Sequence, residues 1–397
     1  MWMLKSICGN FGSSTSCAFA VALMVGFAAS APSAQGQTFT LLYTFAGGAD
    51  GAQPMGLVRD SAGNLYGTTL YGGGGRCSLN AGCGTIFKLD DAGNETVLHA
   101  FTGGKDGTLP WATLIPDAAG NLFGATLNGG NLQCGVVTGC GTIFKLDATG
   151  KKTVLYSFPS LVDGALPYGV VRDAKGNFYG TTAYGGTGDG TVFKVDATGK
   201  ETVLHSFAGG PDGSGPYAGV VRDKAGNLFG TTYGGTIFKV DSTGKETVLH
   251  TFSGTDGAGP IGSLMPYGEN LYGTTSSFGE FGYLFDGTVF MLNKTGEYTV
   301  VYNFADGTDG GSPTGNLIHD AAGILYGVTN YGGDFGRGTV FKVDPATGAE
   351  TVLYSFTGGA DGGYPAAGVI MDSAGNLYGT TIDGGAFNFG TVFKITP

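Results

Sequence analysis

Charged residues are scarce in this sequence, and basic residues are the scarcer sign. Charged side chains make up 13% of the 397 residues, with 20 Lys and Arg against 31 Asp and Glu and a formal net charge of -11 at pH 7. Nucleic-acid binding draws its affinity from clustered Lys and Arg side chains that contact phosphates. The composition therefore argues against nucleic acid, and against other polyanions, as partners.

The sequence also lacks an apolar run long enough to cross a membrane. Its longest run, residues 18–29, has twelve residues, whereas a spanning helix needs about twenty. The run follows Lys5 and precedes a tail of small residues that ends at Ala34, which is the layout of a secretory signal peptide. We therefore expect residues 1–34 to be cleaved, the protein to be secreted into the periplasm or the extracellular space, and the mature chain to have no integral membrane segment.

Cysteine is rare as well, and only four of the six cysteines lie beyond the expected signal peptide. They form two pairs with a spacing of six residues, Cys77 with Cys83 and Cys134 with Cys140, and each pair ends just before a Gly-Thr-Ile-Phe motif. Exported proteins meet an oxidising environment, and no histidine accompanies either pair. The pattern favours two local disulfides, with a zinc site as the alternative.

Glycine, by contrast, is abundant, with 78 residues, and the chain is 42% hydrophobic and rich in Phe and Tyr. The glycines have no three-residue period, which excludes collagen, and such a weakly charged chain can bury a core. Seven copies of a unit of roughly 50 residues follow residue 37, a period typical of propellers and solenoids. Each unit contains four short segments rich in Val, Thr, Phe and Tyr, separated by Gly, Asp and Asn turns, which predicts four strands per unit.

The two ends of the array indicate a closed ring. Residues 38–45 match the fourth strand of a unit, whereas the last unit stops after its third strand. A ring that completes its last blade with residues 38–45 leaves no exposed edge, whereas a linear β-solenoid, the alternative, would need polar caps. We predict an all-β, seven-bladed β-propeller over residues 38–397. The expected blades span about 54–101, 110–158, 167–207, 216–252, 260–304, 313–356 and 365–396.

The repeat unit resembles a known family. Its motifs Pro-x-Gly, Asp-x-x-Gly-Asn-Leu-Tyr-Gly-Thr-Thr, Gly-Thr-Val-Phe-Lys and Thr-Val-Leu-Tyr-Ser-Phe are similar to the Gloeo/Verruco (GloVer) tandem repeat of choice-of-anchor exported bacterial proteins, and more distantly to NHL propeller repeats. The resemblance covers residues 38–397. It implies an exported propeller without a defined activity, and the NHL likeness implies binding rather than one chemistry.

Several recurring residues are better explained by structure than by function. An Asp-Gly pair follows the fourth strand of every unit; a ring of carboxylates could bind a cation, but Asp before Gly is a common turn pair. A glycine inside every second strand predicts a bulge or a close approach by a neighbouring blade. His99, His205 and His250 occupy a position that other units fill with Tyr, which indicates packing. We expect no metal and no cofactor.

Binding groups should lie where the repeats differ, because shared residues maintain the ring. Just after the Pro that opens the first strand stand Trp111, Tyr168 and Tyr217 in three consecutive units, and the loops between second and third strands add Tyr184 and Tyr233. Such flat rings suit the faces of sugars, although they also pack ordinary cores. These five residues are the candidate ligand-binding site.

Three classes of function remain open. The first is a secreted, non-catalytic module, expected to be a monomer, that binds a polysaccharide or another cell-surface ligand. The second is a structural or protein-interaction propeller of the cell envelope. The third is a polysaccharide lyase or hydrolase, for which Glu280 and Asp286 could form an acid/base pair.

Overall fold

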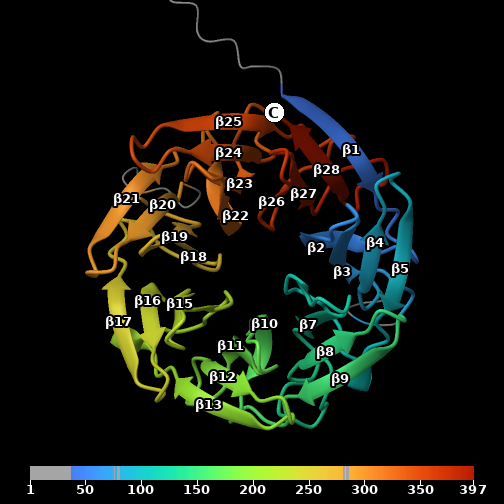
Figure 1. Cartoon of the computed structure of the whole chain (residues 1–397), viewed down its shortest axis with the longest axis vertical. Helices are drawn as coiled ribbons and strands as arrows, with labels where there is room; N and C mark the ends of the chain where they lie inside the picture. Colours follow the sequence, from blue (N-terminus) through green and yellow to red (C-terminus); the bar gives the residue numbers. More distant parts are fainter. Residues whose placement is uncertain (1–36, 76, 78–80, 280–281, 283–285) are drawn as a thin grey trace, which may run out of the picture. The chain divides into compact units, whose positions relative to one another are not determined.

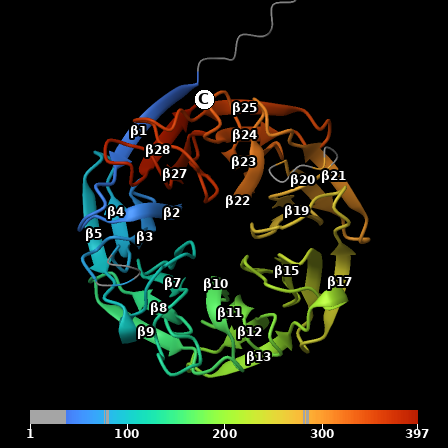
Figure 2. The same ribbon diagram turned by 180° about the vertical axis from the view of Figure 1, so that it is seen from behind.

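Seven four-stranded antiparallel sheets form a ring in the computed structural model of this chain (Figure 1; seen from behind in Figure 2). The structure describes residues 37–397 apart from 76, 78–80, 280–281 and 283–285, so the expected signal peptide lies outside the described residues. In blades 1 to 6 the strands follow chain order from the channel to the rim. The arrangement confirms the seven-bladed β-propeller and rules out the linear solenoid.

The first strand of the chain, β1, belongs to blade 7, and blades 1 to 4 follow it in chain order. Blade 1 contains β2 (Ala52–Arg59), β3 (Leu65–Tyr71), β4 (Thr85–Leu89) and β5 (Glu95–Ala100). Blade 2 contains β6 (Ile115–Pro116), β7 (Leu122–Thr126), β8 (Thr142–Leu146) and β9 (Lys152–Ser157). Blade 3 contains β10 (Ala165–Arg172), β11 (Phe178–Tyr184), β12 (Thr191–Val195) and β13 (Glu201–Ser206). Blade 4 contains β14 (Val221–Arg222), β15 (Leu228–Thr232), β16 (Thr236–Val240) and β17 (Glu246–Thr251). Two short 3-10 helices, η2 (Gly104–Asp106) and η3 (Gly210–Asp212), follow β5 and β13.

Blades 5 to 7 complete the ring. Blade 5 contains β18 (Met265–Tyr267), β19 (Asn270–Thr275), β20 (Thr288–Leu292) and β21 (Tyr298–Asn303). Blade 6 contains β22 (Gly311–His319), β23 (Leu325–Tyr331), β24 (Thr339–Val343) and β25 (Glu350–Ser355). Blade 7 contains β26 (Ile370–Met371), β27 (Leu377–Thr381), β28 (Thr391–Thr396) and, as its outer strand, β1 (Thr38–Thr44).

The first strand of the chain closes the ring, as the sequence predicts. β1 pairs antiparallel with β28, from Thr38 opposite Thr396 to Thr44 opposite Thr391. The two ends of the propeller therefore share one sheet, and the outer edge of β28 is covered (Figure 1).

The hydrophobic core lies between the blades and is built on phenylalanine. The Phe of each third strand contacts the Phe that follows the outer strand of the preceding blade, for example Phe193 with Phe158, at a centroid distance of 5.1 Å. All seven junctions contain such an edge-on pair, with centroids 5.0 to 5.5 Å apart. Edge-to-face contact is a favourable geometry for aromatic rings. The invariant Phe residues of the repeat thus join each blade to the next.

The glycine inside each second strand makes room for the ring of that Phe. Gly180 lies opposite Phe193 in the sheet, and a Cβ atom on Gly180 would come within 2.8 Å of the Phe193 ring. The expected bulge is present in blades 1, 3 and 6, where the register between the first and second strands shifts beside this glycine. The close side-chain contact comes from the same blade and not from a neighbouring one. A flat ring can lie across the strand only where the opposite residue has no side chain.

A second recurring junction joins the blades on the side of the loops that follow the second and fourth strands. The backbone N–H of Leu166, just before the Pro that opens blade 3, donates to the carbonyl oxygen of Cys140 in blade 2 at 3.1 Å. The ring of Pro167 packs on Gly141, which has a φ of +97°. This contact explains why each repeat has a Gly just before its third strand and a Pro where its innermost segment begins.

Candidate functional site

The inner segments of all seven blades surround a central channel with a volume of about 540 Å³. The residue that follows the opening Pro of a blade lines the channel in six of the seven blades. These residues are Met55, Trp111, Tyr168, Tyr217, Ile261 and Ala366. One part of the wall is therefore aromatic and the rest is aliphatic or small.

Aromatic side chains from blades 2, 3 and 4 stand in one continuous row. The ring centroid of Trp111 lies 5.7 Å from that of Tyr168, which lies 5.1 Å from that of Tyr217. Tyr233 continues the row at 5.4 Å from Tyr217, and Tyr184 forms a hydrogen bond with Tyr217. The structure thus brings together all five residues selected from the sequence, and we call them the aromatic cluster.

The rings of the aromatic cluster are not part of the buried core. Trp111 is 36% exposed, Tyr184 is 48% exposed and Tyr233 is 53% exposed. Tyr168 and Tyr217 are half-buried. The cluster is therefore a surface at the mouth of the channel, where ring faces and hydroxyl groups are accessible together.

The described wall of the channel carries no Asp, Glu, Lys, Arg or His side chain, and its ionisable groups are the two tyrosines. The hydrogen bond with Tyr184, together with burial, raises the pKa of Tyr217 to about 12. Burial, followed by the proximity of Tyr184, also raises the pKa of Tyr168. Both phenols stay protonated near neutral pH, so they can donate and accept hydrogen bonds but do not act as bases.

The sequence profile of the Gloeobacter/Verrucomicrobia repeat matches residues 30–235 and 209–393, which together span most of the chain. The chain belongs to this family. The match confirms the resemblance drawn from the repeat motifs. No curated protein matches the chain.

Solved structures show the same fold at low sequence identity. The extracellular domain of a B. thetaiotaomicron protein assigned as a hybrid two-component system has a TM-score of 0.60 and 12% identity, over 90% of this chain and 39% of that chain. The Gloeobacter/Verrucomicrobia repeat chain thus spans about two fifths of the length of that chain. A Bacteroides uniformis protein assigned as a 6-phosphogluconolactonase has a TM-score of 0.50 and 17% identity, over 75% of this chain and 84% of that chain. Likeness at these identities shows the fold alone.

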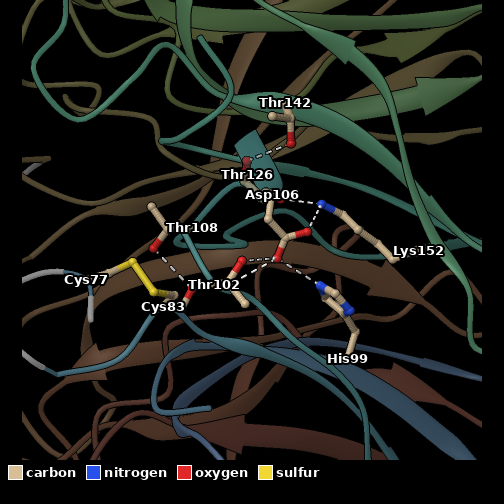
Figure 3. A network of polar contacts seen from close by, with 9 residues as sticks. All are labelled: Cys77, Cys83, His99, Thr102, Asp106, Thr108, Thr126, Thr142 and Lys152. Carbon is tan, nitrogen blue, oxygen red and sulfur yellow. Dashed lines mark hydrogen bonds and ion pairs between the residues drawn. A yellow bond between two sulfur atoms is a disulfide. The ribbon is translucent and has the colours of Figure 1, made fainter. Parts of the chain in front are cut away.

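The Asp residues of the Asp-Gly pairs form turns in this Gloeobacter/Verrucomicrobia repeat protein. Asp106 shows the shared turn bond and adds an ion pair found in blade 2: its carboxylate accepts hydrogen bonds from the backbone N–H of Thr102 at 2.9 Å and from the Nζ of Lys152 at 2.8 Å, and it pairs with Nε2 of His99 at 3.1 Å (Figure 3). These bonds hold the pKa of Asp106 well below its usual range against the effect of burial. The carboxylate is thus engaged with its own loop and with the next blade.

The three histidines of the outer strands are structural for the same reason. His205 pairs with Asp212 at 3.1 Å and His250 with Asp256 at 2.9 Å, as His99 does with Asp106. Each ring also packs edge-on against the Phe two residues later. The packing interpretation was correct, and the structure adds the Asp partner.

The four cysteines form two disulfides, Cys77–Cys83 and Cys134–Cys140, so the zinc alternative was wrong. Within the part of the chain that the structure describes, no three His, Cys, Asp or Glu side chains are grouped as a metal site requires. In that same part, no helix is long and apolar enough to span a membrane.

Of the acid/base pair considered for catalysis, the structure describes only Asp286. Glu280 lies outside the described residues. Asp286 is 1% exposed, and its backbone oxygen accepts a hydrogen bond from Ser312 at 2.8 Å, which is the junction between blades 5 and 6. Asp286 is therefore a buried junction residue of the Gloeobacter/Verrucomicrobia ring.

Sequence reasoning missed a second group of aromatic and cationic side chains, in blades 6 and 7. Tyr364 contacts both Tyr331 and Arg337 at the same end of the ring as the aromatic cluster. Tyr364 could have been noticed because it is the one aromatic residue among those that precede the opening Pro. The seven residues at that position are Gln53, Leu109, Leu166, Gly215, Gly259, Ser312 and Tyr364.

Proposed function

We propose that this protein is a secreted, non-catalytic propeller that binds a saccharide at the mouth of its central channel. The continuous row of accessible rings in the aromatic cluster carries the proposal. Aromatic faces suit the apolar faces of sugar rings, and phenol hydroxyl groups can bond to sugar hydroxyls at the edge of the stack. Three consecutive blades each contribute to this surface, so the site forms where these blades lie side by side in the folded ring.

The chemistry of the channel wall supports binding rather than catalysis. General acid–base catalysis needs a titratable group within reach of the substrate and with a pKa near the working pH. The tyrosines of the described wall have raised pKa values and stay neutral. The lactonase assignment of the Bacteroides uniformis neighbour is therefore not transferred to this chain, which shares its fold.

Three observations support the proposal of secretion. The first residues have the layout of a signal peptide. Two disulfides are typical of proteins that fold in an oxidising compartment. One structural neighbour is an extracellular domain.

The single tryptophan within residues 37–397 provides the test. Trp111 belongs to the aromatic cluster, so binding of a saccharide to the exported protein should change tryptophan fluorescence. We would titrate mixed-linkage β-glucan, xylan, galactomannan and polygalacturonate and determine affinity by calorimetry. Tyr168→Ala should abolish binding while the melting temperature stays close to that of the wild type, because the ring is not a core residue.

The matched control is Leu41→Ala, which removes an exposed apolar side chain from the outer strand β1. It should leave affinity unchanged. A core aromatic would cost about 3–5 kcal/mol on truncation, so a large loss of stability in Tyr168→Ala, with no binding by the wild type, would refute the proposal. Capture of a protein without any saccharide signal would favour the envelope-scaffold function, and turnover of a polysaccharide would favour an enzyme.

A further inference from the structure

Blades 6 and 7 carry a second cluster of stacking side chains. The Tyr331 ring, at the end of β23, lies 5.6 Å from the Tyr364 ring at an interplanar angle of 73°. The guanidinium carbon of Arg337 lies 5.0 Å from the Tyr364 ring centroid, and its Nη1 donates a hydrogen bond to the Tyr364 hydroxyl. We call Tyr331, Arg337 and Tyr364 the second cluster. It combines aromatic faces with a planar group of several N–H donors.

The backbone does not require a tyrosine at position 364. Tyr364 has a φ of +56° and precedes Pro365, and at the equivalent position blades 4 and 5 have Gly215 and Gly259, which adopt a positive φ without a steric cost. The Tyr364 N–H donates to the Arg337 carbonyl at 2.8 Å, and its own carbonyl accepts from Ile382 at 3.3 Å. The fold therefore holds this ring in place at a site where glycine would satisfy the backbone better.

The Arg337 side chain is also held in place by its surroundings. Its side-chain stem packs flat on Gly358, where a Cβ atom would lie 2.9 Å from the Arg337 Cγ. The equivalent residues of other blades include Cys83, Cys140 and Phe389, so the position itself does not need an arginine. Arg337 and Tyr331 are exposed and Tyr364 is half-buried. The second cluster is therefore accessible to a ligand while its side chains are fixed by their contacts.

The two clusters lie at the same end of the ring and on opposite sides of the channel. The aromatic cluster belongs to blades 2, 3 and 4, and the second cluster to blades 6 and 7, which face them across the channel in Figure 1. The residues of both clusters lie in the loops that follow second and fourth strands or at the ends of those strands, except Tyr168, which lies in the first half of the inner strand β10 that such a loop leads into. A ligand long enough to contact both must lie across the mouth of the channel.

We propose that the second cluster is a further saccharide subsite and that the propeller binds an extended polysaccharide chain across the channel mouth, not a single sugar. This inference rests on the proposed function, because it assumes that the aromatic cluster binds sugar rings. Tyr331 and Tyr364 supply faces for stacking, and Arg337 supplies N–H donors for hydroxyl or carboxylate oxygens. Two subsites joined by one chain give an affinity that rises steeply with chain length.

The experiment compares Tyr364→Gly with the wild-type exported protein in native gels that contain β-glucan, xylan, galactomannan or polygalacturonate. Tyr364→Gly removes the ring and leaves a residue that suits the positive φ, so the variant should melt no lower than the wild type. Its affinity for the polysaccharide that retards the wild type should fall roughly tenfold, as for other interface aromatics. Its affinity for a disaccharide of the same linkage should not change, because that ligand reaches only the aromatic cluster.

Gln53→Gly is the matched control, since Gln53 has the same φ of +56° before a Pro and lies outside both clusters. It should bind polysaccharide like the wild type. Equal retardation of Tyr364→Gly and wild type by the polysaccharide would overturn the second subsite and leave the proposed function intact. If none of the four polysaccharides retards the wild type, the proposed function fails, and this inference fails with it.

Discussion

A glycine that faces a phenylalanine is the smallest unit of this architecture. In blade 5, Gly273 lies opposite Phe290, and a Cβ atom on Gly273 would come within 2.5 Å of the Phe290 ring and 3.1 Å of the Leu264 side chain. Phe290 is fully buried and also contacts Phe252 of blade 4. A residue without a side chain is therefore required so that the ring can reach the junction between the blades.

We expect Gly273→Ala to destabilise the protein by about 1–3 kcal/mol, because a methyl group in this contact overpacks a close-packed core. Chemical denaturation measures the change in the free energy of unfolding. The control is Gly48→Ala, where nothing lies within 4 Å of the added methyl group, and its stability should match the wild type. Equal stability of Gly273→Ala and Gly48→Ala would show that the ring is not held against the glycine.

Four glutamates occupy a different kind of junction, at the rim. Each begins an outer strand and has a buried Oε1 that, among the described residues, has no hydrogen-bond partner; they are Glu95, Glu201, Glu246 and Glu350. Burial, and then the Asp of the Asp-Gly pair in the loop after the preceding outer strand, raises their pKa values to about 7. At the equivalent position blade 2 has Lys152, whose Nζ reaches Asp106 at 2.8 Å. The side chain at this position, Glu or Lys, thus decides whether the junction contains a protonated carboxyl group or an ion pair.

These glutamates should make the propeller less stable as the pH rises. Their folded pKa of about 7 exceeds the ordinary value of 4.5, so protonation favours the folded state. The contribution is complete below 4.5 and is lost as the pH rises through about 7. A variant with all four changed to Gln should therefore show a flatter dependence of melting temperature on pH across that interval. Glu297→Gln, at an exposed turn, should keep the wild-type slope, and an unchanged slope in the fourfold variant would contradict the assignment.

At the scale of an element, β1 connects blade 7 to both of its neighbours. It pairs with β28 of blade 7, the Phe39 ring stacks on Tyr354 of blade 6 at 4.3 Å, and Phe45, just after β1, packs on Phe87 of blade 1 at 5.1 Å. β1 and the residue that follows it thus contact blades 6 and 1 in addition to completing blade 7.

A chain that starts at Gly51 should therefore lose its cooperative thermal transition and associate through the exposed edge of β28. Calorimetry and size-exclusion chromatography would show both effects. A chain that starts at residue 37 is the control and should melt like the exported protein. If the chain from Gly51 melted within a few degrees of that control, β1 would not be needed for closure.

The inner strands show what the sequence could not predict about an element. The repeats predict four similar strands in each blade, yet β6, β14, β18 and β26 are only two or three residues long. Around the channel the backbones of adjacent blades touch: a Cβ atom on Gly262 would lie 2.2 Å from the backbone oxygen of Gly315 in the next blade. A pattern within one repeat contains no information about such contacts between repeats.

At the scale of the whole molecule, the sequence predicts the ring because its period and its two unmatched ends are both visible in one dimension. It also predicts the aromatic cluster, because Trp111, Tyr168 and Tyr217 occupy one equivalent position in consecutive repeats. The second cluster was missed because Tyr331, Arg337 and Tyr364 occupy three different positions in two repeats. The rim junctions were missed because the outer strands run head to tail around the circumference, an arrangement that only the folded ring reveals (Figure 1).

The order of the strands in the chain offers a final test of ring closure. Thr396 lies opposite Thr38, so the end of β28 is beside the start of β1, as at the turn between third and fourth strands in the other blades. A short linker from Pro397 to Gln37, with new ends at Gly51 and Asp50, would move β1 to the end of the chain and make every blade contiguous. All strand pairs and both clusters are kept in this permutant. No strand then joins the two ends of the chain within one sheet.

We expect the permutant to fold to the same ring and to bind saccharide like the native chain, but to unfold faster in denaturant. Its ends would meet only at the junction between blades 7 and 1, which is held by side-chain packing and a few backbone hydrogen bonds, whereas the native ends share the ladder between β1 and β28. Unfolding rates report interactions that must break before the transition state. Because the permutant keeps the same strands, a change in its unfolding rate reports the way the ring is closed. An equally slow unfolding rate in the permutant would mean that packing between blades alone keeps the ring closed.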